Sequence, residues 1–384
     1  MAAGFLFWAT AAWWALTLFV QWLSAALARR RRPSQATRHA AADFSIVAPL
    51  AGGRDASQAY IGSLAALSRA GAEVLICVVD PGEEVARQAR AHWPEAPILV
   101  GADRTFNPKL NNVRKGLEAA SRPVVALCDA GIGLGEAALA EAAALLSPKV
   151  GLVLALKAGT APENFAAEME CAYINGHQAR FLLAADRLGM AVASGGVTIL
   201  SRDTLQQIGV HAGFLRYIAD DYSVVRAVRS QAGRTTWLGN SLPPMPVGER
   251  SWADVWRRQV RWGSTRLNLP FEVKALVLFE PAIGWLASGL AGIVALLALG
   301  AGSATVVIAV GLHTVAWLAA EAWFLAGYGL PFGPRAWTAA LVREALAPLL
   351  AAQSWLGRHS IDWRGTDLAA GWRPARDGAE GNSV

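Results

Sequence analysis

The sequence predicts an α/β domain, built on a mostly parallel sheet, that is joined to apolar helices able to enter a membrane. Between residues 44 and 156, short apolar runs alternate with amphipathic helical patterns, which is typical of a parallel sheet covered on both faces. Long apolar segments flank this region, and the whole chain is 54% hydrophobic with a mean hydropathy of +0.32. This composition is too apolar for an ordinary cytosolic protein.

The first element is an apolar run over residues 4–27 that contains no charged residue. It has about the 20 residues that a spanning helix needs, so we expect a transmembrane helix over 1–28. Arginines occupy positions 29–32, and the positive-inside rule then places the N-terminus outside and the chain from 33 onward in the cytoplasm. A cleaved signal peptide is the alternative, but no basic side chain precedes the apolar run.

A basic tether over 29–43 leads into the predicted sheet domain, which extends over 44–250. We expect its strands at 44–49, 73–79, 97–100, 124–128, 150–156 and 194–200. We expect helices at 57–68, 83–92, 111–120, 135–146 and 164–185, with another opening near 218–222. The proline-rich stretch 241–250 is predicted to be a loop.

Three segments follow the sheet domain. A basic and Trp-rich juxtamembrane stretch is expected over 251–273, transmembrane and interfacial helices over 274–357, and a C-terminal tail over 358–384. Spanning helices are predicted at 275–301 and 304–325. The third apolar run, 336–356, contains Arg343 and Glu344, and a full span there would export a basic tail. We therefore expect it to be interfacial or re-entrant.

The formal net charge of +6 does not indicate nucleic acid, because no helix-turn-helix, zinc-finger or RNP signature accompanies it. Anionic lipid headgroups and an anionic cosubstrate explain the charge better. Cys77, Cys128 and Cys171 are not at metal-ligand spacing and are predicted to be free thiols in a reducing compartment.

Acidic residues stand where ligands bind in such sheets, beyond the carboxyl ends of strands. Asp80 and Asp129 each follow a predicted strand, and Asp220 and Asp221 open a later helix. Helix or turn capping is the alternative for each of them. Together with the arginines near 257–266, they could supply a metal ligand, a base and cations for a leaving phosphate, the parts needed for group transfer from a charged donor.

Five ordered motifs resemble those of ceramide glucosyltransferases: Asn107-Pro-Lys-Leu-Asn-Asn112, Cys128-Asp-Ala-Gly-Ile132, Ile218-Ala-Asp-Asp-Tyr222, Arg258-Gln-Val-Arg-Trp262 and Ile361-Asp-Trp-Arg-Gly365. The resemblance runs from about Phe44 to Trp372. It implies a GT-A fold and an inverting, membrane-bound hexosyltransferase related to cellulose and chitin synthases. The implied reaction moves a sugar, glucose above all, from a UDP-sugar to the hydroxyl of ceramide and gives a β-glycosyl lipid.

The resemblance also implies donor-binding residues. Asp80 would lie at the uracil or ribose, and Lys109 with Asn112 would hold the nucleotide. Asp129 would bind Mg²⁺ or Mn²⁺ on the diphosphate. The segment Asp129-Ala-Gly lacks a second carboxylate, so the cation would rely on one aspartate, the diphosphate and water.

Catalytic and acceptor-binding residues are implied in the same way. Asp221 would be the general base, with Asp220 beside it. Arg258, Arg261 and Trp262 would contact the diphosphate or the acceptor at the membrane face, the alternative being a basic helix that only binds headgroups. His177 matches a histidine of the acceptor or donor region, the alternative being a structural histidine.

Other functions remain open on the sequence. Hopanoid-modifying glycosyltransferases, which would add N-acetylglucosamine to a hopanoid polyol, share Asp80-Pro81 and the Asn-Pro-Lys motif. A processive polysaccharide synthase would need more helices for its channel, and a non-catalytic nucleotide binder leaves Asp220 and Asp221 unexplained. The Ala- and Arg-rich composition indicates a bacterial protein. With the predicted spans and the positive-inside rule, we expect a multi-pass protein of the inner membrane with its catalytic domain in the cytoplasm.

Overall fold

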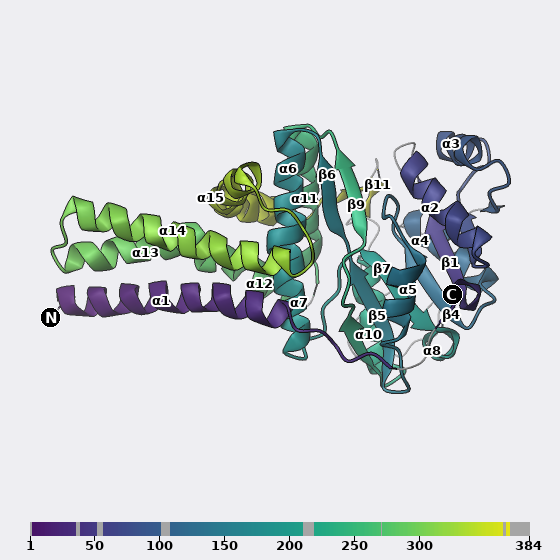
Figure 1. Ribbon diagram of the computed structural model, residues 1–384, viewed down its shortest axis with the longest axis horizontal. Helices are drawn as coiled ribbons and strands as arrows, with labels where there is room; N and C mark the ends of the chain where they lie inside the picture. Colours follow the sequence, from purple (N-terminus) through teal and green to yellow (C-terminus); the bar gives the residue numbers. More distant parts are fainter. Residues whose placement is uncertain are drawn as a thin grey trace. The chain divides into compact units, whose positions relative to one another are not determined.

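The computed structural model describes residues 2–35, 39–51, 57–100, 108–209, 219–269, 271–363 and 366–368. The chain divides into two units, each assembled from segments far apart in the sequence (Figure 1). Unit 1 combines Met1–Arg30, Gly159–Met190 and Val247–Arg358. Unit 2 combines Arg31–Ala158, Ala191–Pro246 and the chain from His359 onward.

Unit 2 is built on a sheet whose described strands follow the order β3-β2-β1-β4-β7-β5-β8. Their bounds are β1 Phe44–Pro49, β2 Glu73–Cys77, β3 Ile98–Leu99, β4 Val124–Cys128, β5 Val150–Leu156, β7 Gly196–Ser201 and β8 Thr235–Leu238. All neighbours pair in parallel except β7, which is antiparallel to β4 and β5. Every residue of β1, β4 and β5 is buried, as expected for strands covered on both faces. The predicted mostly parallel α/β architecture is confirmed.

The helices of unit 2 are α2 Gln58–Arg69, α3 Glu84–His92, α4 Pro108–Ala119, α5 Glu136–Ala143, α8 Arg202–Ile208 and α10 Asp220–Ser230. Helix α4 packs closely on the sheet at Gly116, where an added Cβ would lie 2.3 Å from Val47 Cγ1. A glycine is needed there because any side chain would push the helix off β1. This contact fixes the N-terminal end of α4, which carries Lys109, relative to the strands.

Two short pairs of strands complete the fold: β6 Ala158–Pro162 with β9 Pro244–Gly248, and β10 Asp362–Trp363 with β11 Thr366–Asp367. The strand β9 lies in the stretch 241–250, which was predicted to be a loop. Met245 and Val247 are buried while Pro244 and Pro246 are exposed. The prolines thus alternate with core residues at period two, which a strand tolerates at its edge.

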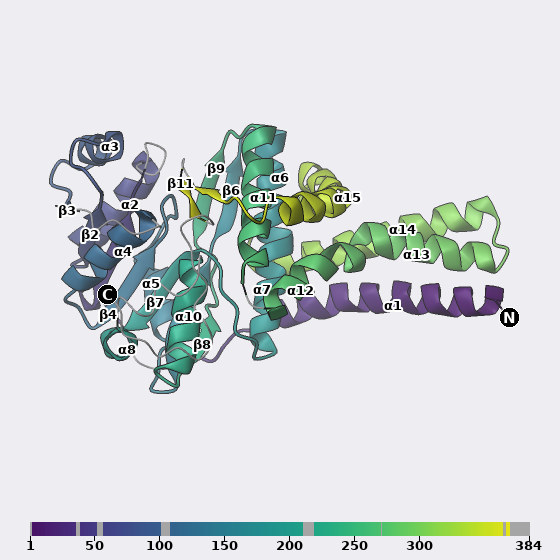
Figure 2. The same cartoon turned by 180° about the vertical axis from the view of Figure 1, so that it is seen from behind.

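Unit 1 is helical. Its elements are α1 Ala2–Ala28, α6 Phe165–Cys171, the π-helix η3 Ala172–Ala179, α7 Arg180–Arg187, α11 Trp252–Leu267, α12 Phe271–Phe279, the 3₁₀ turn η4 Glu280–Ile283, α13 Trp285–Ala298, α14 Ser303–Ala326 and α15 Pro334–Leu356. Helix α1 lies alongside α13 and α14 (Figure 2). It is also tied to α7, because Arg180 is fully buried and its guanidinium donates to Gln21 and, at 3.0 Å, to Ser24 Oγ.

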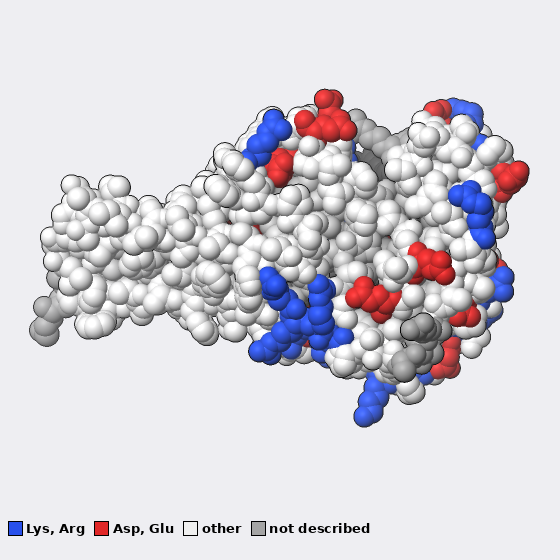
Figure 3. Space-filling view, viewed as in Figure 1, with Lys and Arg blue, Asp and Glu red and all other residues white. Residues whose placement is uncertain are grey.

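Two helices, with apolar stretches at Gly4–Ala28 and Ser303–Ala326, are long and apolar enough to cross a membrane by length and composition. The predicted span over 275–301 is instead interrupted between Phe279 and Trp285, since Pro281 lacks the N–H that a continuous helix requires. Figure 3 shows that the N-terminal part of α1 and the adjoining ends of α13 and α14 carry no charged side chain on the face in view, as far as their residues are described.

Candidate active site

Three predicted site residues from separate segments meet in unit 2. Lys109 Nζ lies 2.8 Å from Asp129 Oδ1 and 2.8 Å from Asp220 Oδ2. Lys109 is in the first turn of α4, Asp129 directly follows β4, and Asp220 is the first residue of α10. Because β4 is a parallel strand within the sheet, Asp129 stands at the carboxyl edge where such sheets bind ligands.

Opposite charges keep this cluster ionised. Burial by itself would raise the pKa of Asp129, but the ammonium groups of Lys109 and Lys157 lower it below its usual value. Burial also opposes the charged form of Lys109, yet the carboxylates of Asp129 and Asp220 raise its pKa. The Lys109 ammonium therefore lies between the carboxyl groups of Asp129 and Asp220.

Lys157 and Gly195 belong to this site and were not predicted. A Cβ at Gly195 would lie 2.6 Å from Asp129 Oδ2 and 3.4 Å from Lys157 Nζ. The glycine lets the chain before β7 approach the carboxylate. Its signal in the sequence is the Gly195-Gly196 pair at the start of the strand predicted over 194–200.

Asp221 has the electrostatics of a base. Burial, and then the neighbouring Asp220 carboxylate, raise its pKa to about 6, against the opposing influence of Lys109. Its Oδ1 accepts a hydrogen bond from the Tyr222 backbone N–H at 2.8 Å. A carboxylate with this pKa is ionised at pH 7 and can accept a proton with a larger driving force than an ordinary aspartate.

Asp80 and Asn112 make local contacts. Asp80 is exposed, and its Oδ1 accepts a hydrogen bond from the Gly82 backbone N–H at 2.7 Å, which forms a turn. Asn112 is fully buried, and its Nδ2 donates to the Leu50 carbonyl oxygen at 3.1 Å. This hydrogen bond joins α4 to the residue after β1. Asn112 therefore helps to position the helix that carries Lys109.

The carboxylate oxygens of this site could bind a divalent cation if substrate phosphates and water supplied most of the cation's ligands. Among the described residues, no three His, Cys, Asp or Glu side chains are grouped to hold a metal. Asp129 and Asp220 nevertheless share one cation already, the Lys109 ammonium. Magnesium is commonly bound by one or two carboxylates together with substrate phosphates and water.

The predicted motif residues Arg258, Arg261 and Trp262 lie on α11 of unit 1. Arg258 pairs with the fully buried carboxylate of Glu170 on α6, and Arg250 Nε lies 3.4 Å from the other oxygen of that carboxylate. Arg258 therefore neutralises a buried anion in the structure as it stands. This contact could not be predicted, because Glu170 is distant in sequence.

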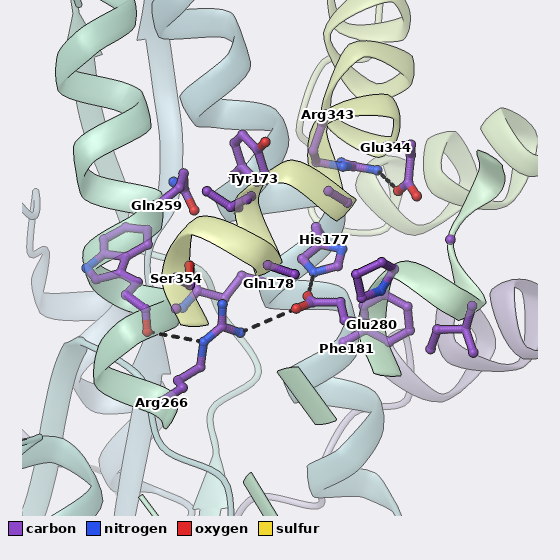
Figure 4. A pocket seen from close by; sticks show the side chains of 18 of the residues that line it. Tyr173, His177, Gln178, Phe181, Gln259, Arg266, Glu280, Arg343, Glu344 and Ser354 are labelled. Atoms are coloured by element: carbon purple, nitrogen blue, oxygen red, sulfur yellow. Dashed lines mark hydrogen bonds and ion pairs between the residues drawn. The ribbon is translucent and has the colours of Figure 1, made fainter. Parts of the chain in front are cut away.

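Trp262 and His177 line one pocket within unit 1, of about 50 Å³ (Figure 4). His177 Nε2 is hydrogen-bonded to Glu280 Oε1, and Arg266 lies 4.0 Å from Glu280 Oε2. Sequence reasoning brought His177 and Trp262 together but missed Glu280. Its signal is a carboxylate at the edge of an apolar segment, a position at which charge is costly unless it has a role.

Comparison with known proteins gives a consistent result. The sequence profile of glycosyl transferase family 21 matches residues 6–375. Ceramide glucosyltransferase 3 of Caenorhabditis elegans is 25% identical over 317 residues, which are 78% of this chain and 66% of that protein. Ceramide glucosyltransferase 1 of the same organism is 28% identical over 167 residues, 41% of this chain and 36% of that protein. The matched regions thus span less than two thirds of the length of these relatives.

Among solved structures, the chain is similar to the mannosyltransferase PcManGT from Pyrobaculum calidifontis in complex with GDP-Man and Mn²⁺. The TM-score is 0.51 at 15% identity, and the match covers 93% of this chain and 98% of that chain. At this identity the likeness shows the fold alone. The expected GT-A fold is confirmed.

Proposed function

The chain belongs to glycosyl transferase family 21, and we propose that it transfers glucose from UDP-glucose to a hydroxyl of ceramide and forms a β-glycosyl lipid. The observation that carries the proposal is the charged cluster of Lys109, Asp129 and Asp220, with Asp221 next to it and of raised pKa. A nucleotide-sugar transferase needs such a set, namely charges for a diphosphate and a base for the acceptor.

Lys109 and Asp129 are assigned to the donor diphosphate. Lys109 supplies positive charge, and Asp129, with Asp220, would hold Mg²⁺ or Mn²⁺. When bound, the divalent ion stabilises the negative charge that develops on the leaving diphosphate. Asp80 is assigned to the uracil or ribose, and Asn112 keeps α4, and with it Lys109, in place.

Asp221 is assigned as the general base. Its carboxylate takes the proton of the acceptor hydroxyl while the hydroxyl oxygen bonds to the anomeric carbon, and the bond from that carbon to the diphosphate breaks. Asp220 supports this role because its negative charge raises the pKa of Asp221. One displacement inverts the anomeric centre, so an α-linked donor gives a β-linked product.

The acceptor is assigned to unit 1. His177 and Trp262 line its pocket, and Arg258 and Arg261 lie on the same helix as Trp262. The two long apolar helices and the names of the curated relatives support a membrane lipid as acceptor. We place the protein in a bacterial inner membrane with unit 2 in the cytoplasm, because the arginines at 29–32 follow the first apolar helix.

The test incubates membranes containing the protein with labelled UDP-sugars and separates lipid from aqueous products. We expect label from UDP-glucose in a ceramide-derived lipid. If label from UDP-N-acetylglucosamine appears in a hopanoid polyol, the proposed donor and acceptor are both wrong, but the reaction is still a glycosyl transfer to a lipid. A labelled polymer in the aqueous phase would indicate a polysaccharide synthase, and no transfer from any UDP-sugar a non-catalytic nucleotide binder.

A further inference from the structure

The pocket of unit 1 contains a carboxylate oxygen whose hydrogen-bonding capacity is unused. Glu280 Oε1 is bonded to His177, but Arg266 lies 4.0 Å from Oε2, which is too far for a hydrogen bond. The described residues give Oε2 no other donor, and the Glu280 side chain is 25% exposed. Figure 4 shows the Glu280 carboxylate next to His177 and Arg266, with a dashed line to each of them.

Four residues that line the same pocket carry a buried hydrogen-bond donor without a partner among the described residues: Tyr173 Oη, Gln259 Nε2, Trp317 Nε1 and Arg343 Nε. Tyr173 Oη and Gln259 Nε2 are the two that belong to neutral side chains without an aromatic N–H. Tyr173 is 6% exposed and Gln259 5%. Burial raises the pKa of Tyr173 to about 12, so its phenol stays neutral and can donate. Unpaired buried donors are destabilising, and a ligand with oxygen atoms would satisfy them.

The charges around the pocket favour a neutral ligand over a phosphate. Arg343 is 2% exposed and donates to two carboxylates, Glu321 at 2.9 and 3.0 Å and Glu344 at 2.7 Å. These two carboxylates more than balance its single positive charge. The remaining lining includes the apolar side chains of Phe181, Ile283 and Leu350. The site thus matches a neutral polar group attached to an apolar chain.

The size of the pocket limits which part of a ligand enters. A buried water needs roughly 10–15 Å³ of such space, so about 50 Å³ accommodates a few polar atoms. This matches the few polar atoms at the end of a lipid alcohol.

We propose that this pocket receives the polar end of the acceptor lipid, with a lipid hydroxyl donating a hydrogen bond to Glu280 Oε2. His177 and Arg266 position the carboxylate, and Tyr173 and Gln259 donate to oxygen atoms of the same headgroup. The inference rests on the proposed function, since it takes the acceptor to be a neutral lipid alcohol. It makes Glu280 a determinant of acceptor specificity.

The test compares Glu280→Gln with Glu249→Gln, the same change at an exposed glutamate of unit 1, in the full-length protein in nanodiscs. We expect Glu280→Gln to raise the KM for ceramide at least about tenfold, the loss of a hydrogen bond to a charged group. The KM for UDP-glucose should stay unchanged, as should both constants in Glu249→Gln. An unchanged KM for ceramide in Glu280→Gln would overturn the inference.

A second experiment distinguishes a direct contact with Glu280 from a structural effect of its replacement. It uses a ceramide analogue without the hydroxyl group that does not receive the sugar. The wild type should lose affinity for the analogue, whereas Glu280→Gln should bind ceramide and the analogue equally. Equal losses for the analogue in both proteins would contradict the contact. If Glu280→Gln does not fold, Ala347→Leu narrows the pocket from α15 and leaves the ion pairs intact. It should also raise the KM for ceramide, and an unchanged KM would contradict the inference.

If the wild type glycosylates no lipid, the proposed function is wrong. Binding of ceramide to the pocket can then still be measured on its own. A photoreactive ceramide should label the wild type and Glu249→Gln but not Glu280→Gln. Equal labelling of all three proteins would overturn the inference, as would labelling that phosphatidylglycerol displaces and unlabelled ceramide does not.

Discussion

Arg343 and Glu321 form a two-point ion pair inside unit 1, with NH1 to Oε1 at 3.0 Å and NH2 to Oε2 at 2.9 Å. Their side chains are 2% and 1% exposed. The pair joins α15 to α14 and reaches η3, where Arg343 NH1 also donates to the Ala172 carbonyl oxygen at 2.7 Å. It therefore cross-links helices that line the pocket of His177 and Trp262.

Arg343→Leu should destabilise the protein by about 3–5 kcal/mol, because it leaves the Glu321 and Glu344 carboxylates buried without their cation. Thermal unfolding in detergent, followed by tryptophan fluorescence, measures the change in Tm. Arg335→Leu makes the same substitution at an exposed position of the same helix and should leave Tm nearly unchanged. Similar Tm values for the two variants would show that the ion pair does not stabilise unit 1.

Asp221→Asn should lower kcat by about 10²–10⁴-fold, the usual contribution of a general base. Binding of UDP, measured by calorimetry, should be nearly unaffected, since the base acts on the acceptor. Asp203→Asn, at an exposed residue of α8, serves as control. Normal turnover by Asp221→Asn would assign the base to another residue.

The pH profile should report the same carboxylate. A base must be deprotonated to act, so kcat/KM should fall below the pKa of Asp221, which is raised to about 6, by about tenfold per pH unit. Asp220→Asn removes the anion that raises this pKa, and it frees Lys109 from one partner. Both effects lower the pKa of Asp221, so the acidic limb should move to lower pH. A limb that moves upward would contradict the assignment.

Asp129→Ala should weaken binding of the divalent cation. Removal of divalent cations by EDTA should abolish transfer by the wild type, and Mn²⁺ should restore it. In the variant, the Mn²⁺ concentration for half-maximal rate should rise by about tenfold or more, as expected for the loss of a charged ligand. An unchanged Mn²⁺ titration would place the cation away from Asp129.

Gly195→Ala should reduce activity with little effect on stability. The added Cβ would lie 2.6 Å from Asp129 Oδ2, so the carboxylate must move. Gly135→Ala introduces the same methyl group where nothing lies within 4 Å and should leave the rate unchanged. Equal rates for the two variants would show that the position of Asp129 is not critical.

Most of the α/β order was predictable because the strands β1, β2, β4 and β5 are largely apolar runs between turn signals. Nearly all of their residues are buried, as such runs predict. The strand β9 could not be predicted, because its prolines are typical of a loop. Only the structure shows that alternate residues of this stretch are buried. The break at Pro281 was visible in the sequence. It was outweighed by the apolar composition on both sides.

The candidate site was predictable as a set of residue types but not as a set of contacts. Asp129 and Asp221 stand out by their positions after a strand and at a helix start. That Lys109 joins Asp129 to Asp220 depends on how α4, β4 and α10 are arranged around the sheet, which local patterns do not encode. The same holds for His177 and Glu280, which lie on η3 and η4.

The bonds of Arg180 to Gln21 and Ser24 bear on how the protein can be produced. Helix α1 supplies the side-chain partners of a guanidinium that has no contact with solvent, so it is a structural component of unit 1 as well as a hydrophobic segment. If about the first thirty residues were deleted to obtain a soluble fragment, the Arg180 guanidinium would lose its hydrogen bonds to Gln21 and Ser24. An unrelated signal anchor in place of α1 would also fail to satisfy it.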